Sequence, residues 1–250
     1  MQQDLDAAIQ TIHLRFGSQA LRRADSVPAP APWPVGISTV ERLSGIGGLP
    51  AGRLAVLSGT GTCGKLSLAL ALLARATRDF AQAVVIDSKL GFDPWALLPF
   101  GPEIDALTVV RPPHEDAAGE AATSLARAGA GFLLAPPLPE TWLNTLEGAA
   151  ARTGTVVVVV AEVVPPALAH ASSLSFDLER SRWVWDRGQL VGLRARLRCV
   201  KNKVGRPGLE AEIEVRYPVG ARVFSAEPLT EAPVEESEWL EPEEARSAAV

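Results

Sequence analysis

The chain has 250 residues, 47% of them hydrophobic, and a net charge of −5, which suits one large or two small globular domains. Its two cysteines, Cys63 and Cys199, give neither a disulfide framework nor a zinc-ligand pattern, and a reducing compartment fits this usage. The polar first residues are unlike a secretory signal, and the longest apolar run, residues 156–161, is too short to cross a bilayer, so we expect a cytoplasmic protein without membrane contact.

Residues 1–34 predict a helical arm followed by a proline-rich strap. Leu5, Ile9 and Ile12 recur at helical spacing and give the arm an apolar face. Four prolines between residues 26 and 34 exclude a helix there and predict an extended linker. We expect the apolar face to contact another protein or a second copy of this chain.

A phosphate-binding loop follows the apolar residues 54–57 and precedes a helical pattern. Its residues are Gly59, Thr60, Gly61, Thr62, Cys63, Gly64, Lys65, Leu66 and Ser67. The glycines and lysine match G-x-x-x-x-G-K-[ST], in which backbone N–H groups and a lysine charge hold phosphates. Leu66 stands where a hydroxyl should hold Mg²⁺. We expect ATP or ADP as the ligand and leave Mg²⁺ open; a glycine-rich turn with an incidental lysine is the alternative.

Short apolar segments alternate with helical patterns through residues 35–160. The expected strands are 54–57, 83–87, 107–110, 132–135 and 155–160, and the expected helices end near 77 and span 117–128 and 142–151. This alternation is typical of an open α/β sheet. The last strand is fully apolar, which predicts a central position.

The pattern changes to strict alternation beyond residue 161. Residues 193–200 and 210–217 predict two half-buried antiparallel strands, one with a row of arginines and the other with a row of glutamates. Cross-strand ion pairing is favoured over a nucleic-acid surface for these arginines. Trp183 and Trp185 lie two residues apart, and packing in the core is favoured over stacking on bases.

Charge is uneven at the end of the chain. Residues 180–206 contain nine basic residues and one acidic residue, whereas residues 227–250 contain eight glutamates and one arginine. Without this tail the chain carries a net charge of +2. Residues 226–250 therefore predict a disordered acidic tail that competes with an anionic partner for the basic surface.

Taken in order, several segments resemble the RecA family. They are the arm, GGLPAGR at residues 47–53, the phosphate-binding loop, VIDSKLGFDP at 85–94 and VKNKV at 200–204. The resemblance runs from about residue 5 to residue 224. It implies a RecA-like P-loop NTPase core over residues 35–225, with a mostly parallel twisted sheet flanked by helices and a C-terminal antiparallel extension.

The same resemblance implies that the hydrolytic residues are missing. Lys89 occupies the position of the family's catalytic glutamate, and residues 132–135 lead to no acidic residue that could support Mg²⁺. Ala161 and Glu162 stand where an Asn-Gln pair senses the γ-phosphate. We therefore assign no catalytic residue and expect hydrolysis to be absent or very weak.

The resemblance assigns the remaining binding residues. Asp93 matches a base-contacting aspartate, and Trp95 adjoins the position of an adenine-stacking tyrosine. The expected DNA-binding loops are short. Lys201 and Lys203 belong to a basic motif and, with Arg206, are candidates for a DNA or subunit interface.

Three functions remain open. The favoured one is a DNA-repair accessory protein similar to ImuA proteins, shortened RecA relatives that accompany translesion polymerases. Its partners would be a RecA-fold protein, a translesion polymerase complex or a second copy, with single-stranded DNA as a further candidate. The alternatives are an active DNA-dependent ATPase or recombinase, and a regulatory or inhibitory binding module on the same scaffold.

Overall fold

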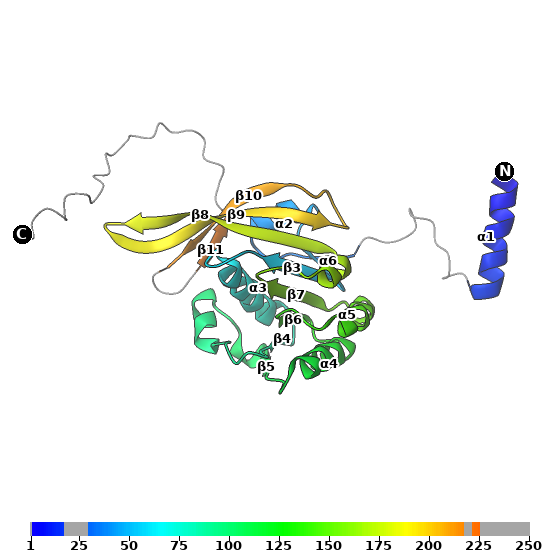
Figure 1. Ribbon diagram of the computed structural model, residues 1–250, viewed down its shortest axis with the longest axis horizontal. Helices are drawn as coiled ribbons and strands as arrows, with labels where there is room; N and C mark the ends of the chain where they lie inside the picture. The colour runs from blue at the N-terminus through cyan, green and yellow to red at the C-terminus, as the bar shows by residue number, and fades with distance from the viewer. Residues whose placement is uncertain (1, 18–29, 218–221, 226–250) are drawn as a thin grey trace, which may run out of the picture.

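The computed structural model describes residues 2–17, 30–217 and 222–225, and its body is one large sheet with helices on both faces (Figure 1). Within these residues the strand order is β11-β10-β9-β8-β3-β7-β6-β4-β5. Residues 54–161 supply β3 (Leu54–Ser58), β4 (Ala83–Ile86), β5 (Leu107–Val110), β6 (Phe132–Ala135) and β7 (Val156–Ala161). The second half supplies β8 (Leu174–Asp186), β9 (Gln189–Asn202), β10 (Glu210–Arg216) and β11 (Arg222–Ser225).

The pairing confirms a mostly parallel α/β sheet with an antiparallel extension. Strands β3 to β7 pair in parallel, and β8 is parallel to β3 on one side and antiparallel to β9 on the other. Strand β7 lies between β3 and β6, and its residues 156–159 are buried, as expected for a fully apolar central strand.

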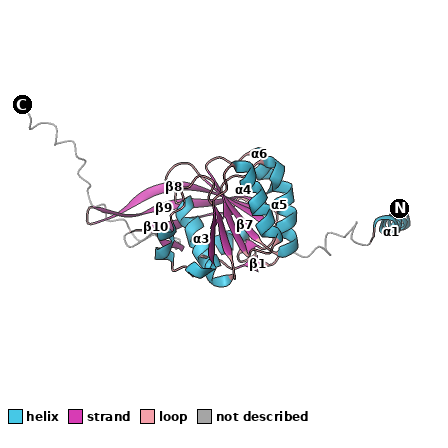
Figure 2. Ribbon diagram, turned by 90° about the horizontal axis from the view of Figure 1, so that it is seen from below, coloured by secondary structure: helices cyan, strands magenta, loops and turns pink. Residues whose placement is uncertain are grey.

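Two hydrophobic layers enclose the sheet. On one face α3 (Lys65–Asp79) and α2 (Ser38–Ser44) pack against the strands, with η2 (Pro94–Phe100) and η3 (Ile104–Ala106) alongside α3. On the other face lie α4 (Glu115–Arg127), α5 (Glu140–Thr153) and α6 (Pro166–Ala171), as Figure 2 shows. Alternate residues of each strand serve the two layers; in β3, Leu57 faces α3 and Val56 faces the other layer.

The antiparallel strands show the expected charge pairing. Arg194 lies opposite Glu214 in the register of β9 and β10, and its Nε donates to the Glu214 carboxylate at 2.8 Å. Burial raises the pKa of Glu214, but hydrogen bonds from Arg216 and Arg194 outweigh it, so the pKa lies below its ordinary value. This confirms the ion-pairing interpretation for Arg194. Arg196 and Arg198 are exposed on the same face, opposite Glu212 and Glu210.

The packing predicted for the two tryptophans is wrong for Trp185. Trp183 is half-buried against the core, but 58% of the Trp185 surface is exposed. The register of β8 against β9 shifts between Val184 and Trp185. Trp185 is paired with Leu190, whereas Trp183 is paired with the buried Leu193. Leu190 lies beyond Gly192, the last residue of β9 that pairs with β10, so Trp185 lies on a part of the two strands that β10 does not border.

The amino-terminal region has two parts in the structure. Helix α1 (Gln2–Phe16) lies apart from the body in both views, and Leu5 is exposed on it while Ile9 and Ile12 are partly covered (Figures 1 and 2). Residues 26–29 of the expected strap lie outside the described residues, and residues 30–34 lie within them. Its end forms β1 (Pro32–Trp33), which pairs with β2 (Leu49–Pro50). The predicted acidic tail, residues 226–250, also lies outside the described residues.

Trp33 anchors the described end of the strap in the core. Its indole Nε1 donates to Asp79 at 2.9 Å, and its ring lies 5.2 Å from that of Phe80 and 5.3 Å from that of Phe132, between centroids. Its side chain is buried. The segment is extended, as its prolines predict, and it is also part of the hydrophobic layer over the sheet.

We therefore expect Trp33→Ala to lower the free energy of unfolding by about 3–5 kcal/mol, because it leaves a large cavity between two aromatic rings and leaves Asp79 with Arg75 as its remaining partner. Urea denaturation followed by circular dichroism measures the change. Trp33→Phe serves as the control and should cost clearly less, since it keeps most of the ring contacts. Equal stability of Trp33→Ala and the unmodified protein would contradict the anchoring role.

Candidate functional site

The phosphate-binding loop connects β3 to α3, as the sequence predicts. The strand ends at Ser58, the helix begins at Lys65, and the turn between them uses glycines with φ angles of 147° (Gly59), 57° (Gly61) and 90° (Gly64). A Cβ on Gly59 would overlap the carbonyl oxygen of Leu178 and lie 2.7 Å from Sγ of Cys63. The loop therefore needs glycine both for its conformation and for its close approach to β8.

Lys65 lies at the centre of this loop and is largely buried. Its Nζ donates to the carbonyl oxygen of Gly61 at 3.1 Å and lies 3.8 Å from Oε1 of Glu162, which follows β7. The Glu162 side chain is 72% exposed, so the pair lies at the edge of the solvent. A bound phosphate would compete with this carboxylate for the lysine charge.

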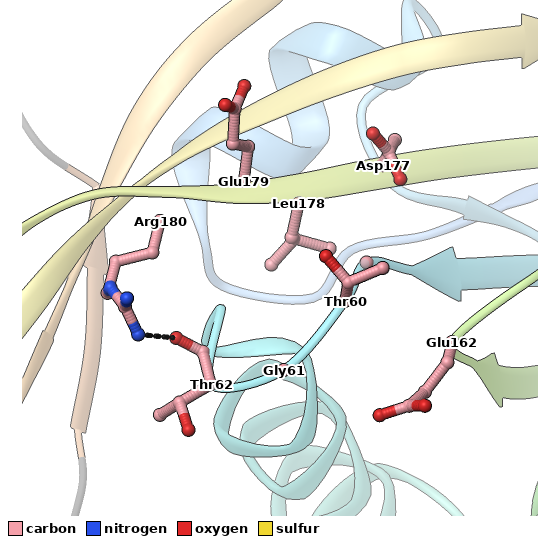
Figure 3. A pocket seen from close by; sticks show the side chains of 9 residues that line it. Thr60, Gly61, Thr62, Glu162, Asp177, Leu178, Glu179 and Arg180 are labelled. Carbon is pink, nitrogen blue, oxygen red and sulfur yellow. Dashed lines mark hydrogen bonds between the residues drawn. The ribbon is translucent and has the colours of Figure 1, made fainter.

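A hollow of about 670 Å³ opens above the loop. Its walls are the loop residues 59–62, Glu162 and residues 177–180 of β8 (Figure 3). Arg180 reaches toward the loop, and its Nη1 donates to the carbonyl oxygen of Thr62 at 3.0 Å, while Glu179 points away (Figure 3). The lining thus combines the loop backbone and Arg180 with three acidic side chains, Glu162, Asp177 and Glu179, while Lys65 does not line the hollow and contacts the Gly61 carbonyl instead. Of these groups, the backbone N–H groups of the loop and Arg180 suit a phosphate.

Arg180 was not singled out from the sequence as a site residue. It lies 118 positions from Thr62 and belongs to a strand that the alternation pattern does not reveal. Nine basic residues between 180 and 206 were noted, but only pairing of β8 with β3 places this one beside the loop.

The other side of Lys65 is apolar. Leu66 is 64% exposed and lines a second hollow of about 340 Å³ at the carboxyl ends of β4, β6 and β7. The apolar residues around it include Leu70, Phe92, Leu134, Ala135, Pro136 and Val160. Asp87 borders it, but its carboxylate oxygens accept from the Gly91 backbone N–H and from Arg111.

This lining does not fit Mg²⁺, which takes oxygen ligands and keeps several waters. No group of three or more His, Cys, Asp or Glu side chains that could hold a metal ion occurs within residues 2–17, 30–217 and 222–225. The glycine loop therefore offers polar groups that suit a phosphate, whereas the place where a metal would act, beside Leu66, is mainly apolar.

Of the two remaining predicted nucleotide residues, Asp93 lines the second hollow and Trp95 does not. Asp93 caps η2 by accepting the Trp95 backbone N–H at 2.9 Å, and it lines the hollow with Ala96. The Trp95 side chain is exposed and does not line it. Lys89 is exposed in the loop after β4. The structure thus brings Asp93 and Leu66 to one hollow and the cradle to the other.

The basic motif at the end of β9 is held against α6. Nζ of Lys201 donates to the carbonyl oxygens of Ala169 and His170, and Nζ of Lys203 also donates to His170, at 3.0 Å. Burial, and after it the charge of Lys203, lower the pKa of Lys201. Both ammonium groups thus face the carbonyl end of a short helix. Arg206 is exposed in the following loop.

Three curated proteins illustrate the similarity of this chain to known sequences. It is 28% identical to "Protein RecA" of Aquifex pyrophilus over 259 residues, which covers 86% of this chain and 74% of that protein. It is 27% identical to "Protein RecA" of Oceanobacillus iheyensis, with 87% and 75% covered, and 28% identical to "Protein RecA" of Salinispora tropica, with 86% and 74% covered.

The model of the RecA N-terminal domain matches residues 3–134, more than half of the chain. A parallel sheet with a phosphate-binding loop after β3 defines the class as a P-loop α/β protein. The chain belongs to the RecA family. It therefore has the RecA-like recombinase scaffold, and no helix in its described ranges has the length and apolar character needed to cross a membrane.

We expect ADP to bind with the same affinity in EDTA as in Mg²⁺, because Leu66 brings no oxygen to the second hollow and the two carboxylates there, Asp87 and Asp93, already accept hydrogen bonds. Lys65→Ala should weaken binding about ten-fold or more by removing a charged phosphate contact. Glu162→Gln should tighten binding, since it removes the competing carboxylate. Isothermal titration calorimetry measures all three, with Glu120→Gln on the exposed face of α4 as the charge-matched control. Marked strengthening by Mg²⁺ would contradict the assignment.

Proposed function

We propose that this chain is a RecA-like accessory protein of DNA repair that holds a nucleotide without hydrolysing it and acts through protein and DNA contacts. The observation that carries the proposal is the contrast around Lys65. The glycine loop keeps the geometry of a phosphate cradle, while Leu66 and the second hollow are apolar. Binding and hydrolysis are thus separated in one site.

The absence of hydrolysis follows from what the transition state needs. Phosphoryl transfer relies on cations and positioned donors around the γ-phosphate and on a group that orients the attacking water. Lys89 is exposed at the position that the family resemblance gives to this group, and Glu162 brings a negative charge to the position of a γ-phosphate sensor. Neither change supports charge development on a phosphoryl group.

The accessory role extends to error-prone repair. The resemblance to ImuA proteins, which are shortened RecA relatives, supports a partner among RecA-fold proteins or translesion polymerase complexes in the damage response. The exposed apolar surface of α1 supports a protein contact at the arm. Because Lys201 and Lys203 donate to carbonyl oxygens of α6, they support a protein interface better than a phosphate surface.

ATP turnover should stay at background, with or without single-stranded DNA, because the groups that stabilise the transition state are replaced. Release of inorganic phosphate measures it, and Lys65→Ala sets the background. Turnover that single-stranded DNA stimulates and Lys65→Ala abolishes would show an active ATPase instead.

Replacing Leu5 and Ile9 by aspartate should abolish capture of a RecA-fold partner, or self-association, because it places charge on the apolar face of α1. Gln10→Asp is the matched control, since it adds a charge to an exposed position of the same helix. Capture on immobilised RecA or translesion polymerase complex, and size-exclusion chromatography for self-association, measure the effect. Unchanged binding by the double variant would rule out the arm as the interface.

A further inference from the structure

One peptide unit of the phosphate-binding loop is hydrogen-bonded at both ends. It consists of the Thr62 carbonyl and the Cys63 N–H. The carbonyl oxygen accepts a hydrogen bond from Nη1 of Arg180 at 3.0 Å (Figure 3). The N–H donates to the carbonyl oxygen of Gly61 at 3.1 Å. Because a trans peptide is planar and its two polar groups point in opposite directions, these two bonds together fix its orientation.

The Gly61 carbonyl occupies groups that a phosphate needs. Besides the Cys63 N–H, it accepts a hydrogen bond from Nζ of Lys65, also at 3.1 Å. The loop lysine and one of the loop N–H groups are therefore satisfied inside the loop. A phosphate that bound both groups would have to replace this carbonyl oxygen. We call this arrangement of residues 61–65 the closed loop.

Arg180 holds the closed loop from outside. For the Cys63 N–H to turn from Gly61 toward a ligand, the peptide unit must rotate, and the Thr62 carbonyl then leaves Arg180. The arginine contact thus favours the closed loop over any arrangement in which this N–H meets a phosphate. Hydrogen bonds from a charged donor are stronger than those between neutral groups, so this contact weighs in the balance between the two arrangements.

The guanidinium group is itself held in place. It lies 4.4 Å from the ring centroid of Trp183, a cation–π contact within β8. The Trp183 ring packs against the core, which fixes its position. No salt bridge joins Arg180 to a carboxylate within residues 2–17, 30–217 and 222–225, so the Thr62 carbonyl does not share this arginine with an acidic partner there.

The loop has room to rearrange at Gly61. The φ angle of this glycine is 57°, and a Cβ built on it would meet no heavy atom within 4 Å. At the start of the loop, by contrast, a Cβ on Gly59 would overlap the carbonyl oxygen of Leu178. Glycine also has the widest choice of backbone conformations. Rotation within residues 61–63 therefore meets less steric resistance than movement of the loop as a whole.

We propose that Arg180 is a positioning residue that gates the phosphate-binding loop. It keeps the loop closed through the Thr62 carbonyl, and a nucleotide binds after that contact breaks. This inference rests on the proposed function, because it takes a nucleotide as the ligand. It adds a form of regulation to that function: a contact outside the phosphate site sets the population of the open loop and the rate of nucleotide entry.

The first test needs no nucleotide. Amide hydrogen exchange of the full-length protein, followed by NMR, reports how often the Cys63 N–H leaves its partner. Arg180→Gln should speed exchange of this amide about five-fold, because it removes the bond at the other end of the peptide unit. The matched control is Arg182→Gln, which removes the same charge from β8 at a residue that does not line the hollow and should leave this exchange unchanged.

The second test follows nucleotide entry. Stopped-flow mixing with fluorescent methylanthraniloyl-ADP should give an observed rate that levels off at high ligand concentration, at the rate of loop opening. Arg180→Gln should raise this plateau about five-fold, whereas Arg182→Gln should not. Because the plateau reports a step that precedes binding, a weaker attraction between the protein and the phosphates does not change it. Circular dichroism melting checks that each variant is folded.

Equal exchange of the Cys63 amide in Arg180→Gln and in the unmodified protein overturns the proposal. It is also overturned by an observed rate that rises linearly with ligand concentration, or by an equal effect of Arg182→Gln. Failure of the proposed function has a different signature: the unmodified protein then binds no nucleotide, while the exchange experiment still decides whether Arg180 holds the loop closed.

Discussion

The close packing of Gly59 against β8 is the constraint on which the site depends. The backbone of the phosphate-binding loop lies against the carbonyl of Leu178, where no side chain larger than hydrogen fits. Because β8 is parallel to β3 and antiparallel to β9, the same strand joins the two halves of the sheet. It also brings Arg180 to Thr62. The shape of the cradle and the position of its arginine therefore depend on the same strand.

In the proposed function, the chemistry around Lys65 separates holding a phosphate from transferring it. Backbone N–H groups in a glycine loop depend on conformation, so they survive changes in neighbouring side chains. Metal coordination and the orientation of water depend on side-chain oxygens, and Leu66 and Pro136 supply none. A scaffold of this kind can keep a ligand as a structural element after its catalytic chemistry is gone.

Much of the fold could be predicted because the parallel strands are short, buried and bounded by turns. The predicted bounds of β5 and β6 agree with the structure. Strand β8 could not be predicted over its full length, since residues 179–182 are all polar and three register shifts interrupt its pairing with β9. Trp33 shows the same limit: prolines predict an extended backbone, but the aromatic pocket of Phe80 and Phe132 forms only in three dimensions.

The candidate site also has some features that a local sequence motif predicts and others that form only when distant strands pair. The loop residues and the missing Mg²⁺ hydroxyl follow from a local motif, so the sequence reveals them. The contact of Lys65 with Glu162 requires β7 beside β3, and the contact of Arg180 with Thr62 requires β8 on the other side. Lys201 is basic in the sequence, yet its ammonium group is held by carbonyls of α6, which only tertiary packing decides.

The continuity of β8 has a thermodynamic consequence. One strand runs from the wall of the phosphate-binding hollow to the exposed tryptophan, and Arg180 contacts the loop with one end of its guanidinium and the Trp183 ring with its face. A ligand that displaced this arginine at the loop would also change the ring it stacks on. Linkage makes any such effect mutual: a ligand that changed the contact of Arg180 with Trp183 would change the affinity of the loop for its own ligand, and the loop's ligand would change the affinity at Trp183 by the same factor.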